Sequence, residues 1–296
     1  MDKTIHVRFG KYVFAFLFEN NEITDFFKLH FNKYISDSAQ DVSIIITVLP
    51  TAKTPFIKPG ARYTHSVNKE KFNFGPGLIR GQWDAQKKIC HLLISKSLLK
   101  AEEIWLFNRL LCRLFYTLSL EEKTEKKNDI IIHSSGVLKN GKGYIFFGPP
   151  ESGKSTIAGL SDKYEVLNDD MNLVHIKGNE ISFEGIPFNP RQLELSGKSG
   201  PLSMIFSLHK NEKVKIEKGT SEEFAKSVIP EVFLPLTLLS EDRKKAFKYL
   251  LKSVKKLGEM IPYYRLYFKK DDSFWKKIET VEEDYGRHQK VLYQKD

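Results

Sequence analysis

The fold is decided by one stretch of the sequence, Gly148-Pro149-Pro150-Glu151-Ser152-Gly153-Lys154-Ser155-Thr156. It fills the pattern G-x-x-x-x-G-K-[ST] and directly follows an apolar run, Tyr144-Ile145-Phe146-Phe147. This order predicts a strand, a turn whose backbone N–H groups face a phosphate, and a helix that begins near Lys154. We expect the stretch to bind nucleotide phosphates, with Lys154 at the terminal phosphates and the Ser155 hydroxyl on Mg²⁺. An ordinary glycine turn is the competing interpretation.

The composition is that of a globular protein. The chain has 296 residues, of which 41% are hydrophobic and 12% aromatic, enough for one large domain or two of ordinary size. No apolar run reaches the length of a membrane span, and the first residues lack the pattern of a signal peptide. We therefore expect a cytoplasmic protein with no membrane association. Cys90 and Cys112 lie in apolar sequence and predict buried thiols.

The charge is strongly positive but dispersed. The chain carries 47 Lys and Arg against 37 Asp and Glu, which gives a formal net charge of +10. The densest charged run, residues 121–127, mixes both signs as a solvated linker does. A solvated surface is the first interpretation and an acidic partner protein or peptide the second. Nucleic acid is the third interpretation and ranks last, because the sequence shows no basic cluster.

The mixed-charge run is also the predicted domain boundary. Residues 1–127 are expected to form a β-rich α+β accessory domain. Its hydrophobic patterns predict a hairpin at 4–18, a helix at 22–34, a strand at 42–49, a meander of short strands between 62 and 92, and a helix at 98–120. It contains no acid–base pair or metal cluster, so we expect it to select the substrate or to form a homo-oligomer.

Residues 128–296 read as an α/β layer structure, because strand and helix patterns alternate. The predicted strands are 130–133, 143–147, 164–167, 172–176, 181–183, 201–208 and 264–268. The predicted helices are 156–160, one that begins near Ser221 with Ser221 or Thr220 as its cap, 242–258 and 273–279.

Two acidic residues follow the phosphate-binding stretch. Asp169 and Asp170 end a short predicted strand, preceded by Asn168. In phosphoryl transfer one carboxylate typically orients the metal and another takes the proton of the attacking group. Adjacent residues on a strand point in opposite directions, so the two aspartates are expected to have different roles. A surface Asx turn is the alternative. His133 ends the strand before the phosphate-binding one, where a histidine is most often packed or at the surface.

These motifs together resemble a known family. The run His133-Ser134-Ser135-Gly136-Val137, then Gly141-Lys142-Gly143, the phosphate-binding stretch and Asn168-Asp169-Asp170 are similar to the catalytic domain of the HPr kinase/phosphorylase family, of which this chain resembles a divergent member. The resemblance covers about residues 128–280. It implies the P-loop kinase fold that this family shares with ATP-dependent phosphoenolpyruvate carboxykinases, the use of ATP and Mg²⁺, and transfer of the γ-phosphate to a serine hydroxyl.

The resemblance also implies roles for individual residues. Lys154 would bind the phosphates and Asp169 would be the general base. Asp170 would support the metal or the base, and His133 would lie near the transferred phosphate.

Two further residues receive roles by position. Glu184 stands where a further carboxylate on the metal is expected, although a turn glutamate fits equally well. Arg191 is expected to clamp phosphate or substrate, and an ordinary exposed arginine is the alternative.

We expect an ATP- and Mg²⁺-dependent kinase that phosphorylates a Ser or Thr hydroxyl of a small protein or peptide. HPr itself is not the expected substrate, because the segment rich in isoleucine and arginine that HPr kinases carry after their aspartates has no counterpart here. Two alternatives stay open: a kinase for the hydroxyl of a free small molecule, and a non-catalytic nucleotide-binding module that regulates a partner enzyme.

Overall fold

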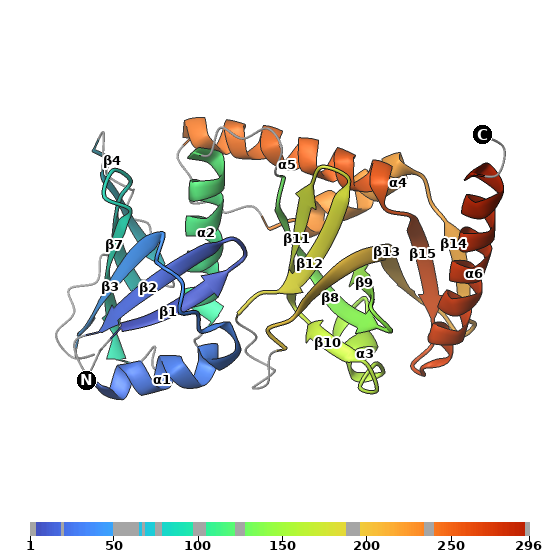
Figure 1. Cartoon of the computed structure of the whole chain (residues 1–296), viewed down its shortest axis with the longest axis horizontal. Coiled ribbons are helices and arrows are strands. Elements are labelled where there is room, and N and C mark those ends of the chain that lie inside the picture. Colours follow the sequence, from blue (N-terminus) through green and yellow to red (C-terminus); the bar gives the residue numbers. More distant parts are fainter. Residues whose placement is uncertain are drawn as a thin grey trace. The chain divides into compact units, whose positions relative to one another are not determined.

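The computed structural model of the chain has a mixed α/β architecture with two large sheets (Figure 1). It describes residues 4–18, 21–49, 65–66, 69–74, 79–96, 105–121, 128–187, 196–233 and 240–293. Contacts divide the chain into two compact units. The first holds residues 1–122, 186–197 and 235–240, and the second holds 123–185, 198–234 and 241–296. The predicted domains, 1–127 and 128–296, follow the sequence order and stay a prediction.

The first unit is built on a seven-stranded sheet whose strands lie in the order β1-β2-β3-β7-β6-β5-β4. Its elements are β1 (Thr4–Phe9), β2 (Tyr12–Phe18), α1 (Asn21–Phe31), η1 (Asn32–Tyr34), β3 (Val42–Leu49), β4 (His65–Ser66), β5 (Lys69–Phe74), β6 (Ile79–Asp84), β7 (Ile89–Ser95) and α2 (Trp105–Glu121). Helix α1 packs its Phe27 on Phe16 of β2, and α2 packs its Phe115 on Tyr12 of the same strand. Alternate residues of a strand share a face, so both helices cover the same face of this sheet.

The second unit contains the phosphate-binding stretch. Its elements are β8 (Ile130–Lys139), β9 (Lys142–Phe147), α3 (Lys154–Gly159), β10 (Glu165–Asn168), β11 (Met171–Lys177), β12 (Glu180–Gly185), β13 (Ser199–Lys210), β14 (Lys215–Lys218), α4 (Ser221–Val228), η4 (Ile229–Glu231), α5 (Ser240–Met260), β15 (Tyr263–Phe268) and α6 (Ser273–Tyr293).

Three parallel strands form the centre of this unit. Strand β13 pairs in parallel with β9 on one side and with β15 on the other. The carboxyl ends of parallel strands meet at one edge of a sheet, where ligands of open α/β folds bind. The loop that follows β9 therefore lies at that edge. Strand β8 pairs antiparallel with β9. On the edge of β8 away from β9, β11 pairs with the first half of β8 and β10 with its second half, both antiparallel.

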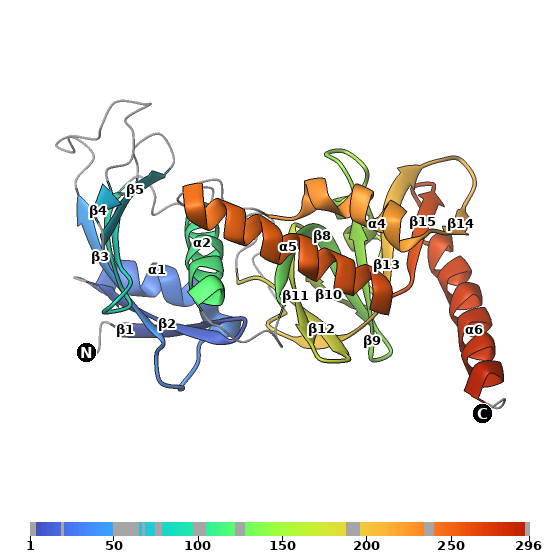
Figure 2. The ribbon, with the colours of Figure 1, turned by 90° about the horizontal axis from the view of Figure 1, so that it is seen from above.

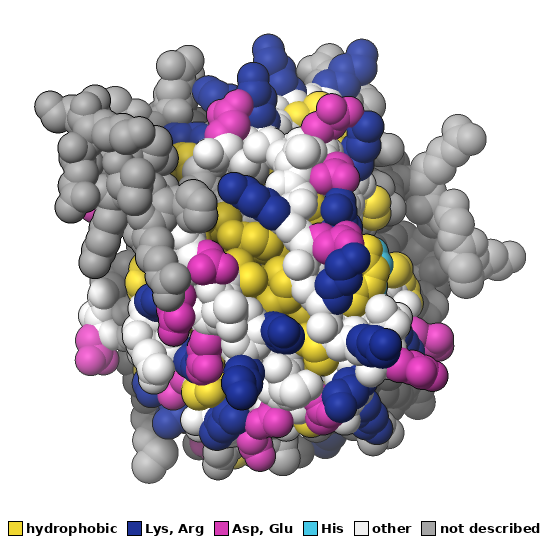
Figure 3. Space-filling model, turned by 90° about the vertical axis from the view of Figure 1, so that its right-hand side faces the viewer, with side chains coloured by type: hydrophobic (Ala, Val, Ile, Leu, Met, Phe, Trp, Pro, Cys, Tyr) yellow, Lys and Arg dark blue, Asp and Glu magenta, His cyan; other side chains and the backbone are white. Residues whose placement is uncertain are grey.

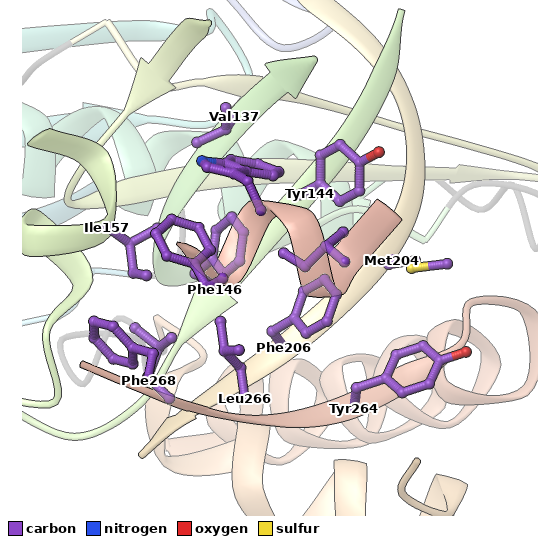
Figure 4. Close-up of a cluster of buried hydrophobic side chains, with 13 residues drawn as sticks. Val137, Tyr144, Phe146, Ile157, Met204, Phe206, Tyr264, Leu266 and Phe268 are labelled. Atoms are coloured by element: carbon purple, nitrogen blue, oxygen red, sulfur yellow. The ribbon is translucent and has the colours of Figure 1, made fainter. Parts of the chain in front are cut away.

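Helices cover both faces of the central strands. Phe146 and Phe147 are consecutive residues of β9 and point to opposite faces. Phe146 packs against Trp275 of α6 and stacks on Phe206 of β13, in a buried cluster that Figure 4 shows in close-up. Phe147 packs against Phe224 of α4 on the other face. Burying such aromatic side chains stabilises the fold by roughly 2–3 kcal/mol each, and it holds β9 rigidly beneath the loop that follows it.

Three elements differ from the prediction. Strand β8 continues to Lys139 although Ser134-Ser135-Gly136 suggested a break after residue 133. Gly136 lies so close to Phe183 that a Cβ there would be 2.8 Å from the ring, so the missing side chain allows close packing instead of ending the strand. Strand β14 was missed, because its charged sequence shows no apolar alternation. Helix α6 is longer than predicted. The predicted cap of α4 is confirmed as Thr220, which forms a capping box with Glu223.

The surface mixes charges. Figure 3 shows one face of the molecule, on which Lys and Arg side chains alternate with Asp and Glu around a strip of apolar side chains. Within the described part of the chain, no helix is long and apolar enough to cross a lipid bilayer.

Candidate functional site

The loop between β9 and α3 has the backbone of a tight cradle. Gly153 has φ +107°, which favours glycine, and Glu151 has φ +65°, which is uncommon for a residue with a side chain. A Cβ at Gly153 would be 2.6 Å from Cζ of the buried Phe268 at the end of β15. Backbone held in such conformations is concentrated at ligand sites. Pro149 and Pro150 have no N–H to offer, so the amides from Glu151 onward would have to contact a phosphate.

We expect the Gly153→Ala variant to be less stable than the wild type by about 1–3 kcal/mol, because alanine adds both backbone strain and the contact with Phe268. Chemical denaturation measures this difference. Gly159→Ala is the matched control, since no heavy atom lies within 4 Å of a Cβ at Gly159. It should leave the stability unchanged or raise it by up to about 1 kcal/mol. Equal effects of the two substitutions would contradict the role of Gly153.

Lys154 is folded back onto the loop. Its side chain is buried, and Nζ donates hydrogen bonds to the carbonyl oxygens of Gly148 at 2.6 Å and Pro149 at 3.2 Å. The two carbonyl oxygens thus hold the ammonium group at the loop. A water molecule or a ligand oxygen could accept the same hydrogen bonds in their place. Ser152 lies in the same loop, and its buried Oγ has no hydrogen-bond partner among the described residues. A buried hydroxyl without a partner costs about 1–3 kcal/mol, which a phosphate oxygen or a water molecule at this place would relieve.

The rest of the stretch is more exposed. Ser155 is exposed and Thr156 half-buried on α3, which spans only Lys154–Gly159. So short a helix adds little macrodipole, and the loop amides with Lys154 would supply most of the positive potential for an anion.

Ser135 of β8 connects this loop with the aspartates. Its buried Oγ donates to the carbonyl oxygen of Lys154 at 2.7 Å and also lies 3.4 Å from the carbonyl oxygen of Asp169. The backbones of Lys154 and Asp169, which are distant in sequence, are therefore adjacent. Ser135 thus links the start of α3 with the turn that contains Asp169.

The predicted Asx turn is present at the aspartates. Asn168 Oδ1 accepts hydrogen bonds from the N–H groups of Asp170 at 2.8 Å and Met171 at 3.1 Å. The turn separates β10 from β11 and gives the two aspartates different surroundings. Asp169 is buried, whereas the side chain of Asp170 is 37% exposed. The Asx turn offered as the alternative is therefore present, and the catalytic role of the two aspartates stays a prediction.

His133 lies between two carboxylates. Its Nε2 is 3.0 Å from Asp170 Oδ1, and its Nδ1 is 3.5 Å from Oε2 of the buried Glu231. The hydrogen bonds with Asp170 and then Glu231 raise the pKa of His133 to about 9, against the opposing effects of burial and of the charge of Lys154. His133 is accordingly protonated at neutral pH and places a positive charge beside Asp170.

Glu184 lies beside a histidine. Its Oε1 lies 3.7 Å from Nε2 of His175, whose Nδ1 is 3.3 Å from Oδ1 of Asp129, and both carboxylates are buried. Across the described residues, no three His, Cys, Asp or Glu side chains are arranged as a metal site. Mg²⁺ in kinases is held by one or two protein ligands together with phosphates and water. The roles of Ser155, Asp170 and Glu184 as Mg²⁺ ligands stay predictions, and in the structure Glu184 has His175 as a neighbour.

This buried His175 cluster makes stability depend on pH. Burial lowers the pKa of His175, but the hydrogen bonds with Asp129 and Glu184 outweigh it and raise the pKa to about 9. A folded-state pKa above the ordinary 6.5 contributes stability below about pH 6.5, which is lost as the pH rises to about 9.

We expect the His175→Gln variant to be less stable than the wild type by about 3 kcal/mol at pH 6, with a smaller difference at pH 9.5. Denaturation at both pH values measures it, with exposed His91→Gln as the control. A difference that does not change with pH would contradict the assignment.

Two residues that contact the candidate site were not predicted from the sequence. Glu231 comes from the short η4 helix, and the bridge between Ile132 and Val232 brings it beside His133. No local pattern could have identified it. Ser135 is two residues from His133 in β8, so the alternation of a strand could have placed it on the same face. Arg191 lies outside the described residues, and its role stays a prediction.

Comparisons with known proteins give a likeness among solved structures alone. No family model and no curated protein matches the sequence. Among solved structures, the HPr(Ser) kinase/phosphatase from Coxiella burnetii is similar with a TM-score of 0.30 and 12% sequence identity. The match covers 54% of this chain and 98% of that one. A likeness at this TM-score is too weak to assign an activity or a P-loop fold.

Proposed function

We propose that the chain is an ATP- and Mg²⁺-dependent kinase that transfers the γ-phosphate to a hydroxyl group, a Ser or Thr of a small protein or peptide. The observation that carries the proposal is the position of the Ser135 hydroxyl, within hydrogen-bond distance of both Lys154 O and Asp169 O. This contact joins the backbone of the loop to the backbone of the first aspartate, which supports a single site that contains both. A binding loop alone needs no such carboxylates, whereas transfer to a hydroxyl needs a group that takes its proton.

The loop would bind the triphosphate. Lys154 Nζ, which now donates to the carbonyl oxygens of Gly148 and Pro149, would donate to phosphate oxygens instead. The Ser152 hydroxyl would gain the partner that it lacks among the described residues. Ser155 and Asp170 would hold Mg²⁺, which neutralises phosphate charge when bound.

The two aspartates and His133 would have the remaining roles in the transfer, which are proton acceptance and electrostatic stabilisation. Asp169 would accept the proton of the attacking hydroxyl. His133 keeps Asp170 in place through its 3.0 Å ion pair, and its positive charge would lower the negative potential that two adjacent carboxylates impose on an incoming phosphate. Glu231 holds the second ring nitrogen, which fixes the orientation of the imidazole.

The test is intact-mass analysis of small proteins and peptides encoded beside this chain's gene, incubated with the chain, ATP and Mg²⁺. An acceptor that gains the mass of one phosphate, only when chain and nucleotide are both present, supports the proposal. Binding of ATP without transfer to any peptide or small metabolite, and without ATP turnover, would overturn it in favour of a nucleotide-binding module.

A further inference from the structure

Helix α5 presents a mixed basic and apolar surface to solvent. Its inward side is buried and includes Ala246, Leu250, Val254 and Leu257. The opposite side, which we call the α5 outer face, consists of Lys244, Phe247, Lys248, Leu251, Lys252 and Lys255, all exposed. Figures 1 and 2 both show α5 on the outside of the second unit, lying over its strands.

The apolar part of the α5 outer face consists of Phe247 and Leu251. Their exposed fractions are 49% and 39%. They are one helical turn apart, so their side chains are neighbours. Single exposed apolar residues are ordinary, but two adjacent large ones on one helix form a patch of the kind that marks an interaction site.

The basic part of the α5 outer face runs beside this patch. Lys244, Lys248 and Lys252 follow one another at intervals of four residues, which places like charges next to each other at a cost of about 0.2–0.5 kcal/mol per pair. Among the described residues of α5, Lys255 forms a loose ion pair with Glu259, with Nζ and Oε1 3.9 Å apart. A negatively charged partner would remove the repulsion among these lysines.

We propose that the α5 outer face docks an acidic amphipathic segment of a partner protein. Phe247 and Leu251 would contact apolar side chains of the segment, and the lysines would pair with its carboxylates. The proposal rests on the proposed function in one respect: the segment belongs to the protein that carries the accepting hydroxyl. Docking away from the loop would raise the effective concentration of that hydroxyl at the site.

A protein segment fits this surface better than a membrane does. A helix that lies in a lipid surface buries an apolar face along its whole length. The apolar face of α5 is already buried, and among the described residues of this helix Phe247 and Leu251 are the large apolar side chains that stay exposed. Two apolar side chains one turn apart match the spacing of anchors in a helical or extended peptide.

The probe for this proposal is a fluorescein-labelled synthetic helical peptide that has glutamates and, at i and i+4 positions, leucines. Fluorescence anisotropy with the full chain, without nucleotide, measures its Kd. We expect Phe247→Ser/Leu251→Ser and Lys248→Glu/Lys252→Glu each to weaken binding at least about tenfold. The matched control, Lys276→Glu/Lys277→Glu, makes the same charge change at exposed positions of α6 and should change the Kd less than about twofold. Circular dichroism verifies that each variant is folded.

Three results would overturn the docking proposal: no binding of the peptide, equal weakening by the α6 control, or equal binding of a scrambled peptide that separates the leucines. Binding to phosphatidylserine vesicles that the α5 substitutions abolish, without peptide binding, would replace the protein segment with a membrane. ATP binding measured on the same variants separates the two proposals. None of these residues belongs to the candidate nucleotide site, so the loss of docking with ATP binding intact leaves the proposed function standing.

Discussion

The Asp169→Asn variant is expected to bind ATP as the wild type does and to transfer phosphate at least about 100-fold more slowly. Asparagine has nearly the same shape as aspartate but cannot accept the proton of the attacking hydroxyl. The backbone contact between Asp169 O and Ser135 Oγ remains, so the loop and the turn keep their positions. Single-turnover phosphorylation of an acceptor peptide measures the rate, and calorimetry measures ATP affinity.

Asp170→Asn is the matched comparison for this prediction. It makes the same chemical change one residue later but removes the charge that faces His133 at 3.0 Å. Because that carboxylate is the main cause of the raised pKa of His133, the pKa should fall, as the NMR titration of the imidazole would show. Asp169→Asn should leave that titration nearly unchanged. Near wild-type transfer by Asp169→Asn would remove this residue from the role of general base.

The second large effect is expected from Lys154→Met. Loss of the charge-assisted hydrogen bonds to phosphate should weaken ATP binding about 10- to 100-fold, while the methionine stem fills the buried space of the lysine. At ATP concentrations about 100 times the Kd, the wild type should gain roughly 2.7 kcal/mol in unfolding free energy. The variant should gain far less at the same concentration. Thermal unfolding with and without ATP and Mg²⁺ measures the ATP-induced stabilisation of the wild type and of the variant.

Lys177→Met is the control for this second prediction. Lys177 is exposed at the end of β11, beside the turn to β12, and its replacement removes the same charge from the chain. It should leave the ATP-induced stabilisation unchanged. A gain in Lys154→Met equal to that of the wild type would show that the loop does not bind the nucleotide through this lysine.

Much of the local structure could be predicted from the sequence, because its causes are local. The hairpin of β1 and β2 follows from two apolar runs around Gly10-Lys11, and the capping box of α4 from Thr220 and Glu223. The strand, loop and helix around Lys154 follow from glycine positions and apolar periodicity. The short strand β14 could not be predicted in the same way, since its pairing with β15 and not its own pattern makes it a strand.

Local patterns are enough to identify the chemical groups of the candidate site: a glycine-rich loop with a lysine, two adjacent aspartates and a histidine, on an alternation of strands and helices. Which of these groups contact one another depends on the folded chain. In the folded chain, His133 lies between Asp170 and Glu231, and Glu184 lies beside His175. Contacts of this kind depend on the register between strands that are distant in sequence, and on the burial that makes an unpaired charge costly. Neither the register between such strands nor the burial of a charge can be read from a local sequence pattern.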